Sequence, residues 1–281
     1  MADRSTSDDW LRRKILADSM HELAHVDDKA TPAEVSHSVG RRTARTLGLA
    51  DPYAEEKRQW IRETLAGEQR IRERLNGLPN PFAATLHLAL AANILDSELR
   101  ADMGQKVSLR GLLDGFAAVP FASDLVVDLE AAIASAREVL FIHSSAAELF
   151  FDRLLIEKMG KPREAVFSIV REAPTLADAT LDDARAVGLD QVATLIHPSA
   201  DTRGLPLDAC SEEVRERFRR ADLVVAKGQA AYETLENREA RLAGGDREGE
   251  QHVFFLLRVK CALVARHLGA SVGDCVLERA G

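Results

Sequence analysis

The sequence is poor in cysteine, and the spacing of its cysteines argues against two classes of protein. Three cysteines occur in 281 residues, Cys210, Cys261 and Cys275, and no two of them form a C-x-x-C pair. An odd number of widely separated cysteines argues against a disulfide framework and against a zinc site built from thiolates. We therefore expect a protein that folds without such cross-links in a reducing cytoplasm.

Long apolar runs are also missing. No stretch approaches the roughly 20 apolar residues that a membrane-spanning helix needs, and the first residues, MADRSTSDDWLRRK, are polar and charged. A secretory signal would require an apolar segment there. We expect a cytoplasmic protein without a membrane partner.

An excess of positive charge is absent as well. The chain has 45 acidic and 37 basic side chains, a formal net charge of -8, and no basic run is interleaved with aromatic residues. Because nucleic-acid-binding surfaces are basic, we expect no nucleic-acid partner. The negative net charge does not exclude a small anionic ligand, since binding one phosphate group takes only a few hydrogen-bond donors.

Residues 1–130 carry helical patterns almost throughout, and we predict a helical N-terminal domain there. The clearest helix start is Thr31-Pro32-Ala33-Glu34, a capping box with proline at the first helical position. The spacing of apolar residues predicts further helices in the same region. The expected helices are Leu11–His25, Pro32–Leu47, Ala54–Arg74 and Phe82–Ile94, with one or two short helices within Lys106–Asp128.

From residue 131 the pattern changes to short apolar runs that alternate with amphipathic stretches. This alternation is typical of βαβ units, with a mainly parallel sheet covered by helices on both faces. We therefore predict an α/β domain over residues 131–281. The expected strands are Val139–Ile142, Ala165–Val170, Val192–His197, Leu223–Ala226 and Val253–Leu257. The expected helices follow Ser145 and span Leu181–Val187, Ser211–Arg220, Gln229–Glu236 and Lys260–Leu268.

Polar residues at the ends of the predicted strands are the candidates for a site, because parallel sheets bind ligands beyond their carboxyl ends. Ser144 and Ser145 follow the first strand and open a helix, whose N-terminus attracts anions. Asp201 follows the third strand, where a carboxylate suits Mg²⁺ or Mn²⁺. Lys227-Gly228-Gln229 ends the fourth strand with groups that bind phosphate. Asp178, in the loop after the second strand, is a further candidate.

Each of these residues also has an ordinary structural explanation. Lys227 fits a common strand-to-helix turn, and Asp201 fits an Asx turn. Asn93-Ile94-Leu95-Asp96 places two polar residues where they satisfy the end of an apolar helix. His21-Glu22-Leu23-Ala24-His25 has the H-E-x-x-H spacing of zinc proteases, but no third ligand follows, so we interpret it as part of a surface helix. We interpret His143 as a core or rim histidine.

Several longer segments, spread over nearly the whole chain, match those of a known protein family in order and spacing. They are TPAE from Thr31, DPYAEEK from Asp51, the Asn93–Asp96 helix end, AELFFDRLLIEKM from Ala147, DATLDDARAVGLDQV from Asp178, SADTRG from Ser199, CSEEVRERFRRADLVVAKGQAAYETL from Cys210 and HVFFLLRVKCALVARHLG from His252. Together they resemble the metal-dependent damage-control phosphatases, the domain-of-unknown-function family eighty-nine, related to the acidic-residue methyltransferase-like proteins.

The resemblance implies a helical N-terminal part, a Rossmann-like three-layer αβα domain, and a phosphatase that uses Mn²⁺, Co²⁺, Ni²⁺ or Mg²⁺ on small phosphorylated metabolites. In that family the turn after the first strand reads D-N-x-G-E. Its Asp and Asn bind the metal together with an Asp from a later loop, which Asp201 matches here. The resemblance assigns catalysis to Asp201 and Lys227. It assigns substrate binding to Ser144, Ser145, Glu148, Asp178, Gln229, Asn93 and Asp96.

Two of the three expected metal ligands are therefore replaced by Ser144 and Ser145, whose hydroxyls are neutral and weak ligands. Three functions stay open. The first is a metal-dependent phosphatase with Asp201 as its remaining ligand. The second is a metal-independent enzyme that acts on another small anionic metabolite. The third is a non-catalytic binder of small molecules. Retained Lys227, Gln229 and Asp201 favour a ligand site. The oligomeric state is not predicted by the sequence.

Overall fold

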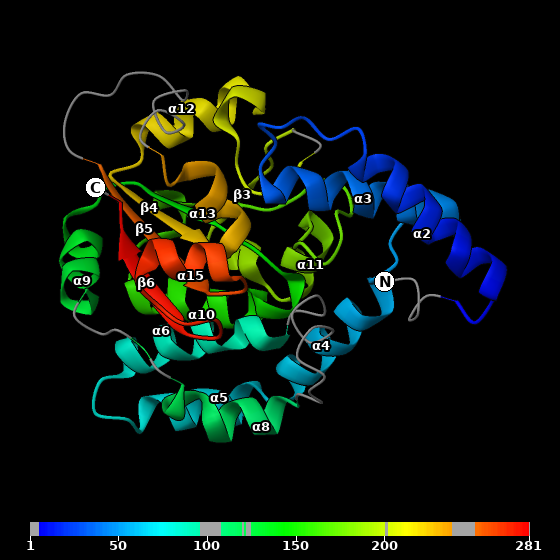
Figure 1. Cartoon of the computed structure of the whole chain (residues 1–281). Coiled ribbons are helices and arrows are strands. Elements are labelled where there is room, and N and C mark those ends of the chain that lie inside the picture. Colours follow the sequence, from blue (N-terminus) through cyan, green and yellow to red (C-terminus); the bar gives the residue numbers. More distant parts are fainter. Residues whose placement is uncertain are drawn as a thin grey trace.

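A computed structural model describes residues 6–95, 108–119, 121, 125–199, 202–237 and 251–280 (Figure 1). Within these residues, six strands form one sheet in the order β3-β2-β1-β4-β5-β6. Neighbouring strands from β1 to β5 are parallel, and β6 runs antiparallel to β5. The strands are β1 (Val139–Ile142), β2 (Val166–Ile169), β3 (Thr194–Ile196), β4 (Leu223–Lys227), β5 (His252–Arg258) and β6 (Cys275–Arg279).

Successive residues of the central strands face opposite sides of the sheet, and both sides are buried. In β1, Val139 and Phe141 lie in one apolar cluster, while Leu140 and Ile142 lie in the other. A strand buried on both faces must be apolar at every position, which explains the continuous runs in the sequence. The mixed α/β prediction with a mainly parallel sheet is confirmed, and the layers form a three-layer αβα fold.

Helices from the second half of the chain cover one face of the sheet. Side chains such as Phe218 and Tyr232 pack against the even-numbered positions of β1 there. The helices on this face are α12 (Glu212–Arg220), α13 (Gln229–Leu235) and α15 (Ala262–Leu268). All three helices were expected from the sequence within two residues of these bounds.

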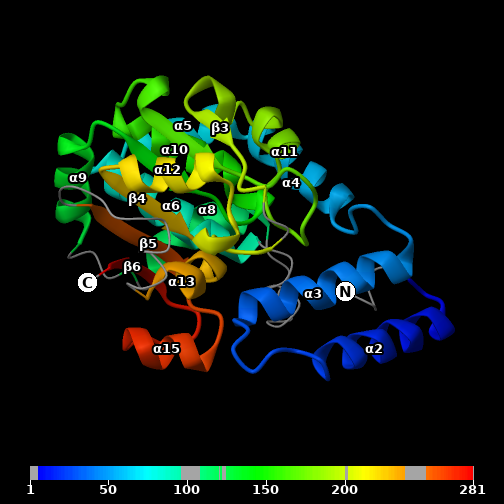
Figure 2. The same ribbon diagram turned by 90° about the horizontal axis from the view of Figure 1, so that it is seen from above.

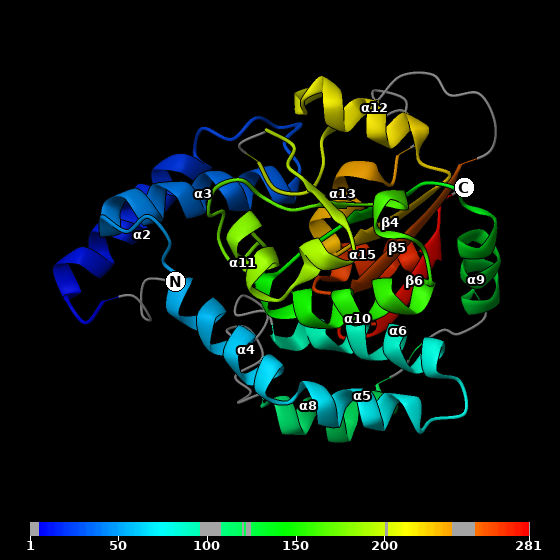
Figure 3. The same cartoon turned by 180° about the vertical axis from the view of Figure 1, so that it is seen from behind.

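The other face of the sheet is covered by helices from both halves of the chain, and α10 packs against α6 there (Figure 3). One apolar cluster contains Trp60 and Leu86 from the first half together with Phe151 and Phe254 from the second. The division at residue 130 therefore stays a prediction. The helices are α4 (Ala54–Ala66), α5 (Glu68–Asn76), α6 (Pro81–Ala91), α8 (Leu109–Gly115), α9 (Val126–Ser135), α10 (Leu149–Met159) and α11 (Leu181–Ala186).

The first two helices pair with each other beside this body (Figure 2). They are α2 (Asp9–Leu23) and α3 (Pro32–Leu47), and the predicted capping box at Thr31 and Glu34 is present. The second helix of this pair, α3, lies near the carboxyl ends of the strands, where its Ser36 contacts Arg203. A helix from the start of the chain thus borders the site.

Two expectations about elements were wrong. The predicted helix Ala54–Arg74 is two helices, because Gly67 interrupts it as the C-cap of α4 and the N-cap of α5. A single glycine inside a helical pattern does not reveal such a break. The strand β6 was not predicted at all; it adds to the edge of the sheet by pairing with β5.

Some predicted features lie outside the described residues, among them Asp96 and Asp201. Among the helices that the structure describes, none is both long and apolar enough to cross a membrane.

Candidate functional site

The candidate site lies at the carboxyl ends of β1 and β4, which are neighbours at the point where the strand order reverses. Such a reversal leaves a crevice between the loops that leave the two strands in opposite directions. Ser144 follows β1, and Gly228 follows β4 with a φ of +83°. A Cβ at residue 228 would lie 2.7 Å from the Cβ of Ser144 and closer still to its Oγ. Glycine is therefore what lets the two strand ends meet.

Ser145 caps the short 3-10 helix Ala146–Glu148 that precedes α10. Its Oγ accepts a hydrogen bond from the N–H of Ala147 at 3.3 Å. The N–H of Ala146 donates to the carbonyl of Ala177, and that of Glu148 donates to the carbonyl of Ser145. These first backbone donors already have protein acceptors, so Ser144 supplies the hydroxyl that makes no hydrogen bond within the described residues.

Lys227 lies below this turn and is 2% exposed. Its ammonium donates to the carbonyl of Ala89 in α6 at 3.0 Å, and it forms ion pairs with Asp152 and, at 2.8 Å, with Glu148. Glu148 in turn accepts a hydrogen bond of 2.7 Å from the amide of Asn93. The buried ammonium therefore joins β4, α10 and the end of α6.

Charge in this buried cluster is fixed by the partners. Burial alone would lower the pKa of Lys227, but the carboxylates of Asp152 and Glu148 outweigh burial and raise it. Burial would raise the pKa of Asp152, but the charge of Lys227 and the hydrogen bond from His143 lower it. Both groups are thus charged near neutral pH, and each depends on the other.

His143 is a core histidine, one of the two roles we expected for it. Its Nδ1 lies 2.8 Å from Asp152 and its Nε2 lies 3.0 Å from the hydroxyl of Ser168. Burial lowers the pKa of His143 despite the neighbouring carboxylate. The neutral ring donates its Nδ1 proton to Asp152, because a carboxylate only accepts, and Ser168 then donates to Nε2. This arrangement has the order of a Ser-His-Asp triad, but Ser168 and Asp152 are fully buried.

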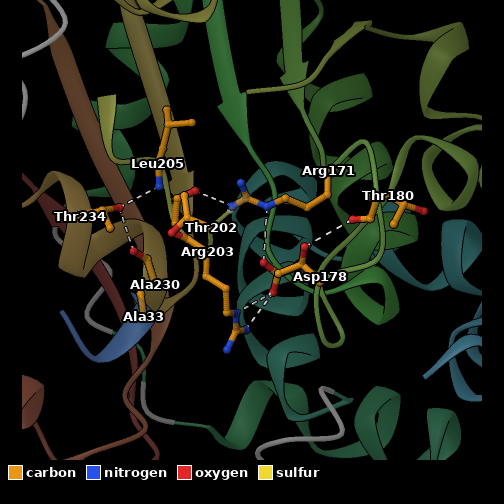
Figure 4. A network of polar contacts seen from close by, with 12 residues as sticks. Ala33, Arg171, Asp178, Thr180, Thr202, Arg203, Leu205, Ala230 and Thr234 are labelled. Atoms are coloured by element: carbon orange, nitrogen blue, oxygen red, sulfur yellow. Dashed lines mark hydrogen bonds and ion pairs between the residues drawn. The ribbon is translucent and has the colours of Figure 1, made fainter. Parts of the chain in front are cut away.

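Asp178 lies above the turn, between two guanidinium groups (Figure 4). Its Oδ1 accepts hydrogen bonds from Arg203 at 2.8 and 3.1 Å, and its Oδ2 lies 3.5 Å from Arg171. Arg203 also donates to the hydroxyl of Ser36 in α3, and Arg171 donates to the carbonyl of Gly204. Two guanidinium groups thus contact one carboxylate, and the residue that carries it pairs with Ser145.

Gln229, the remaining predicted site residue after β4, forms hydrogen bonds that fix a neighbouring loop. The Oε1 of Gln229 accepts a hydrogen bond of 3.0 Å from the backbone N–H of Lys260, and its Nε2 donates to Glu233 at 2.8 Å. The structure thus brings together Ser144, Ser145, Glu148, Asp178, Lys227, Gln229 and Asn93, in a buried layer and an upper layer. Asp96 and Asp201 lie outside the described residues.

The donor set of the described residues does not fit a divalent cation. Ser144 and Ser145 offer neutral hydroxyls, and both oxygens of Asp178 are engaged by arginines. Within the described part of the chain, no three His, Cys, Asp or Glu side chains are grouped so that they would hold a metal ion. Hard divalent cations prefer several charged oxygens. We therefore assign no step to a metal.

Comparison with known proteins places this fold and site in a family. The family model described as the damage-control phosphatase ARMT1-like domain matches residues 1–276. The chain belongs to this family. The match spans both the helical first half and the α/β second half, and the family resemblance seen in the sequence is confirmed.

Two relatives in this family come from archaea and match this chain over nearly its whole length. A damage-control phosphatase of Archaeoglobus fulgidus is 29% identical over 97% of this chain and 91% of its own. The damage-control phosphatase PH1575 of Pyrococcus horikoshii is 27% identical over 99% and 92%. A crystal structure of PH1575, titled as a DUF89 family protein, superposes with a TM-score of 0.77 at 25% identity, covering 100% of this chain and 93% of that one.

Four residues of the site were missed in the sequence. Only Asp152 could have been recognised from the sequence. It lies between Leu149 and Leu155 on the apolar face of a helix, where a charged side chain needs a buried partner. Arg171 lies two residues after β2, and Arg203 lies in the SADTRG loop after β3, so both are in loops at the carboxyl ends of strands. Ser168 lies inside a strand and gave no signal.

Replacing Gly228 with alanine should destabilise the protein and displace Ser144. The left-handed backbone strains any L side chain, and a Cβ would also overlap Ser144. We expect Gly228→Ala to lose about 1–3 kcal/mol more unfolding free energy than Gly160→Ala, measured by urea denaturation. Gly160 is the matched control, because its φ is +65° and nothing lies near its would-be Cβ. Equal losses would contradict the close approach.

Removing the buried ammonium of Lys227 should lower the free energy of unfolding. Lys227→Met leaves Glu148 and Asp152 without their cation, and breaking a buried pair in this way costs about 3–5 kcal/mol of unfolding free energy. Lys29→Met, at an exposed position, should change it by less than about 0.5 kcal/mol. A loss below about 1 kcal/mol in Lys227→Met would show that the three groups are not ionised together.

Stability should fall as the solution is acidified from neutral pH. Burial, and then the charge of Arg41, lower the pKa of His37 from 6.5 to about 4. The unfolded chain therefore takes up a proton below pH 6.5 that the folded chain refuses, so stability is full above that pH and is lost towards pH 4. We expect His37→Gln to flatten the decline by up to about 2 kcal/mol between pH 7 and pH 5. Urea denaturation across this pH range measures both slopes, and identical slopes would contradict the shift.

Proposed function

We propose that this protein is a phosphatase-like enzyme that acts on a small phosphorylated metabolite. The observation that carries the proposal is the pairing of Ser145 with Asp178, which Arg203 binds, next to Ser144 at the strand-order reversal of a damage-control phosphatase fold. The names of the A. fulgidus and P. horikoshii relatives support the same class of reaction. A phosphoryl group has a dense negative charge, and the guanidinium groups of Arg171 and Arg203 near the serine turn are of a kind that binds it.

Each side chain has a proposed part in binding. The hydroxyl of Ser144 donates to a phosphoryl oxygen, while the guanidinium groups of Arg171 and Arg203 offset the charge. Gln229 keeps the Lys260 loop at the mouth of the site through its hydrogen bond to the backbone. Asp201, which lies outside the described residues, remains our proposed catalytic carboxylate.

Lys227 acts through its neighbours in this proposal. Its ammonium holds Glu148, and Glu148 is the last residue of the 3-10 helix that Ser145 caps. The ion pair therefore sets the position of the turn that carries both serines, and Asn93 holds the same carboxylate from α6. We propose that Lys227, Glu148 and Asn93 are positioning residues for that turn. Asp96, outside the described residues, stays a predicted substrate-binding residue.

A second candidate is a metal-independent enzyme that acts on another small anionic metabolite. Two features favour it: the neutral hydroxyls of Ser144 and Ser145, and the two arginines at Asp178. Hydroxyl and guanidinium groups bind an anion without a metal ion. The two candidates share the anion site and differ in the bond that is broken.

Phosphate release tests the proposal. Purified protein should release phosphate from p-nitrophenyl phosphate, and Asp201→Ala should lower the rate at least about 100-fold, as expected for a lost catalytic group. Because hydroxyls replace charged ligands, we expect Mn²⁺ and Co²⁺ to activate the wild-type protein less than the variant Ser144→Asp/Ser145→Asn. The rates are measured with each metal and with a chelator.

The outcomes separate the candidates. Absence of phosphate release in every metal condition, together with a thermal shift on adding inorganic phosphate, would contradict the phosphatase and favour the second candidate. Strong activation of the wild type by Mn²⁺ that the double variant does not exceed would show that the serines suffice as ligands. Ser38→Asp serves as a control, because it adds a carboxylate elsewhere, on α3.

A further inference from the structure

The helix α2 has one side that packs against α3 and one side that faces outward. The inner side is identified by its hydrogen bonds, because Asp18 accepts one from Thr46 and Glu22 accepts one from Ser38. The pair lies beside the body of the protein, with α2 at the outer edge (Figure 2). The side of α2 opposite these bonds therefore meets solvent in a single copy of the chain.

Large apolar side chains gather on α2 although they are not buried. Trp10, Leu16, Met20 and Leu23 are between 52% and 70% exposed. They are four of the nine large apolar residues that are exposed in the described part of the chain, and they lie on one helix of 15 residues. Single apolar residues are ordinary on a surface, whereas a group of neighbours marks an interaction surface.

Helical spacing joins most of these residues into one continuous surface. Leu16, Ala17, Met20, Leu23 and Ala24 recur at intervals of three and four residues, and all five are exposed. We call these five residues the α2 stripe. Side chains at such intervals lie on one face of a helix, so the stripe extends over about 12 Å along the helix axis.

The order of residues in the α2 stripe is complementary to itself. In an antiparallel pair of α2 helices with a twofold axis at Met20, each residue lies opposite the one at the same distance beyond Met20. Leu16 then lies opposite the partner's Ala24, and Ala17 lies opposite the partner's Leu23. A large side chain meets a small one at both levels, which lets the two helices pack closely. A twofold interface needs such self-complementarity.

The charges beyond the two ends of the α2 stripe are complementary as well. Arg13 precedes the stripe on the same side of α2 and forms no ion pair within the described part of the chain, whereas Asp9 pairs with Arg12. The turn that follows the stripe carries the exposed residues Asp27 and Asp28. Antiparallel pairing brings Arg13 of each copy to this acidic turn of the other, so opposite charges meet at both ends.

We propose that two copies of this chain associate through the α2 stripe as a twofold-symmetric dimer. One helix of 15 residues is about 22 Å long, so the contact is smaller than the roughly 800 Å² per partner of a standard interface. The dimer is therefore weak, with a dissociation constant of about 1–100 µM. The stripe contains none of the candidate site residues, so its role can be tested apart from catalysis.

Sedimentation equilibrium of the full chain at concentrations from about 1 to about 300 µM tests the proposal. The wild type should pass from monomer to dimer over this range. Met20→Glu brings two carboxylates together at the twofold axis, and Met20→Lys brings two ammonium groups together. Each substitution should weaken association at least about 100-fold. An equimolar mixture of the two variants should form a dimer again, because a carboxylate then faces an ammonium.

Controls separate the interface from folding and from charge in general. Met20 is 70% exposed, so its variants should unfold at the same temperature as the wild-type monomer. Val127→Glu is the matched control, because Val127 on α9 is also 70% exposed and lies outside the stripe, and it should dimerise like the wild type. Arg13→Glu should weaken the dimer about three- to tenfold, as expected for exposed ion pairs that become like-charge contacts.

Three results would overturn the proposal. They are a wild type that stays monomeric at about 300 µM, a dimer that Met20→Glu leaves intact, and a mixture of the Met20 variants that stays monomeric. The first result, together with binding to phosphatidylglycerol vesicles that Met20→Glu abolishes, would assign the α2 stripe to a lipid surface instead of a second copy.

Discussion

The ion pairs of the buried Lys227 are the interaction on which the rest of the site depends. A single ammonium, with Glu148 and Asp152 around it, ties the end of the central strand β4 to the start of α10 and to the carbonyl of Ala89 in α6. Charges at this depth are stable only together, because each would face several kcal/mol of desolvation alone. The turn that carries Ser144 and Ser145 is therefore supported from below by electrostatics that water does not screen.

Above that layer the charge balance has the opposite sign. The buried layer has two carboxylates around one ammonium, with a neutral His143, whereas the upper layer has two guanidinium groups around Asp178. In our proposal the anion binds beside the guanidinium groups. The layer around Lys227 ties the end of β4 to α10 and α6, so we propose that separate groups bind the anion and support the turn.

Much of the fold and part of the site could be predicted from the sequence, for identifiable reasons. Strands buried on both faces have continuous apolar runs, so β1 was predicted with its exact bounds. The sheet edge where Ser145 pairs with Asp178 and Gly228 approaches Ser144 follows from parallel pairing. The break at Gly67 and the edge strand β6 depend on tertiary packing that no local pattern expresses. Lys227 looked like a residue at the mouth of the site, because burial is not readable from a tripeptide.

The contact between Ser36 and Arg203 joins residues that are 167 positions apart in the chain. Loop closure over such a distance is entropically unfavourable and comes after local structure has formed. During synthesis, α3 leaves the ribosome long before Leu176 and Arg203 exist to pack against it. The border that α3 gives to the candidate site is thus completed only after Arg203 has been synthesised, and a chain that ends earlier lacks that contact.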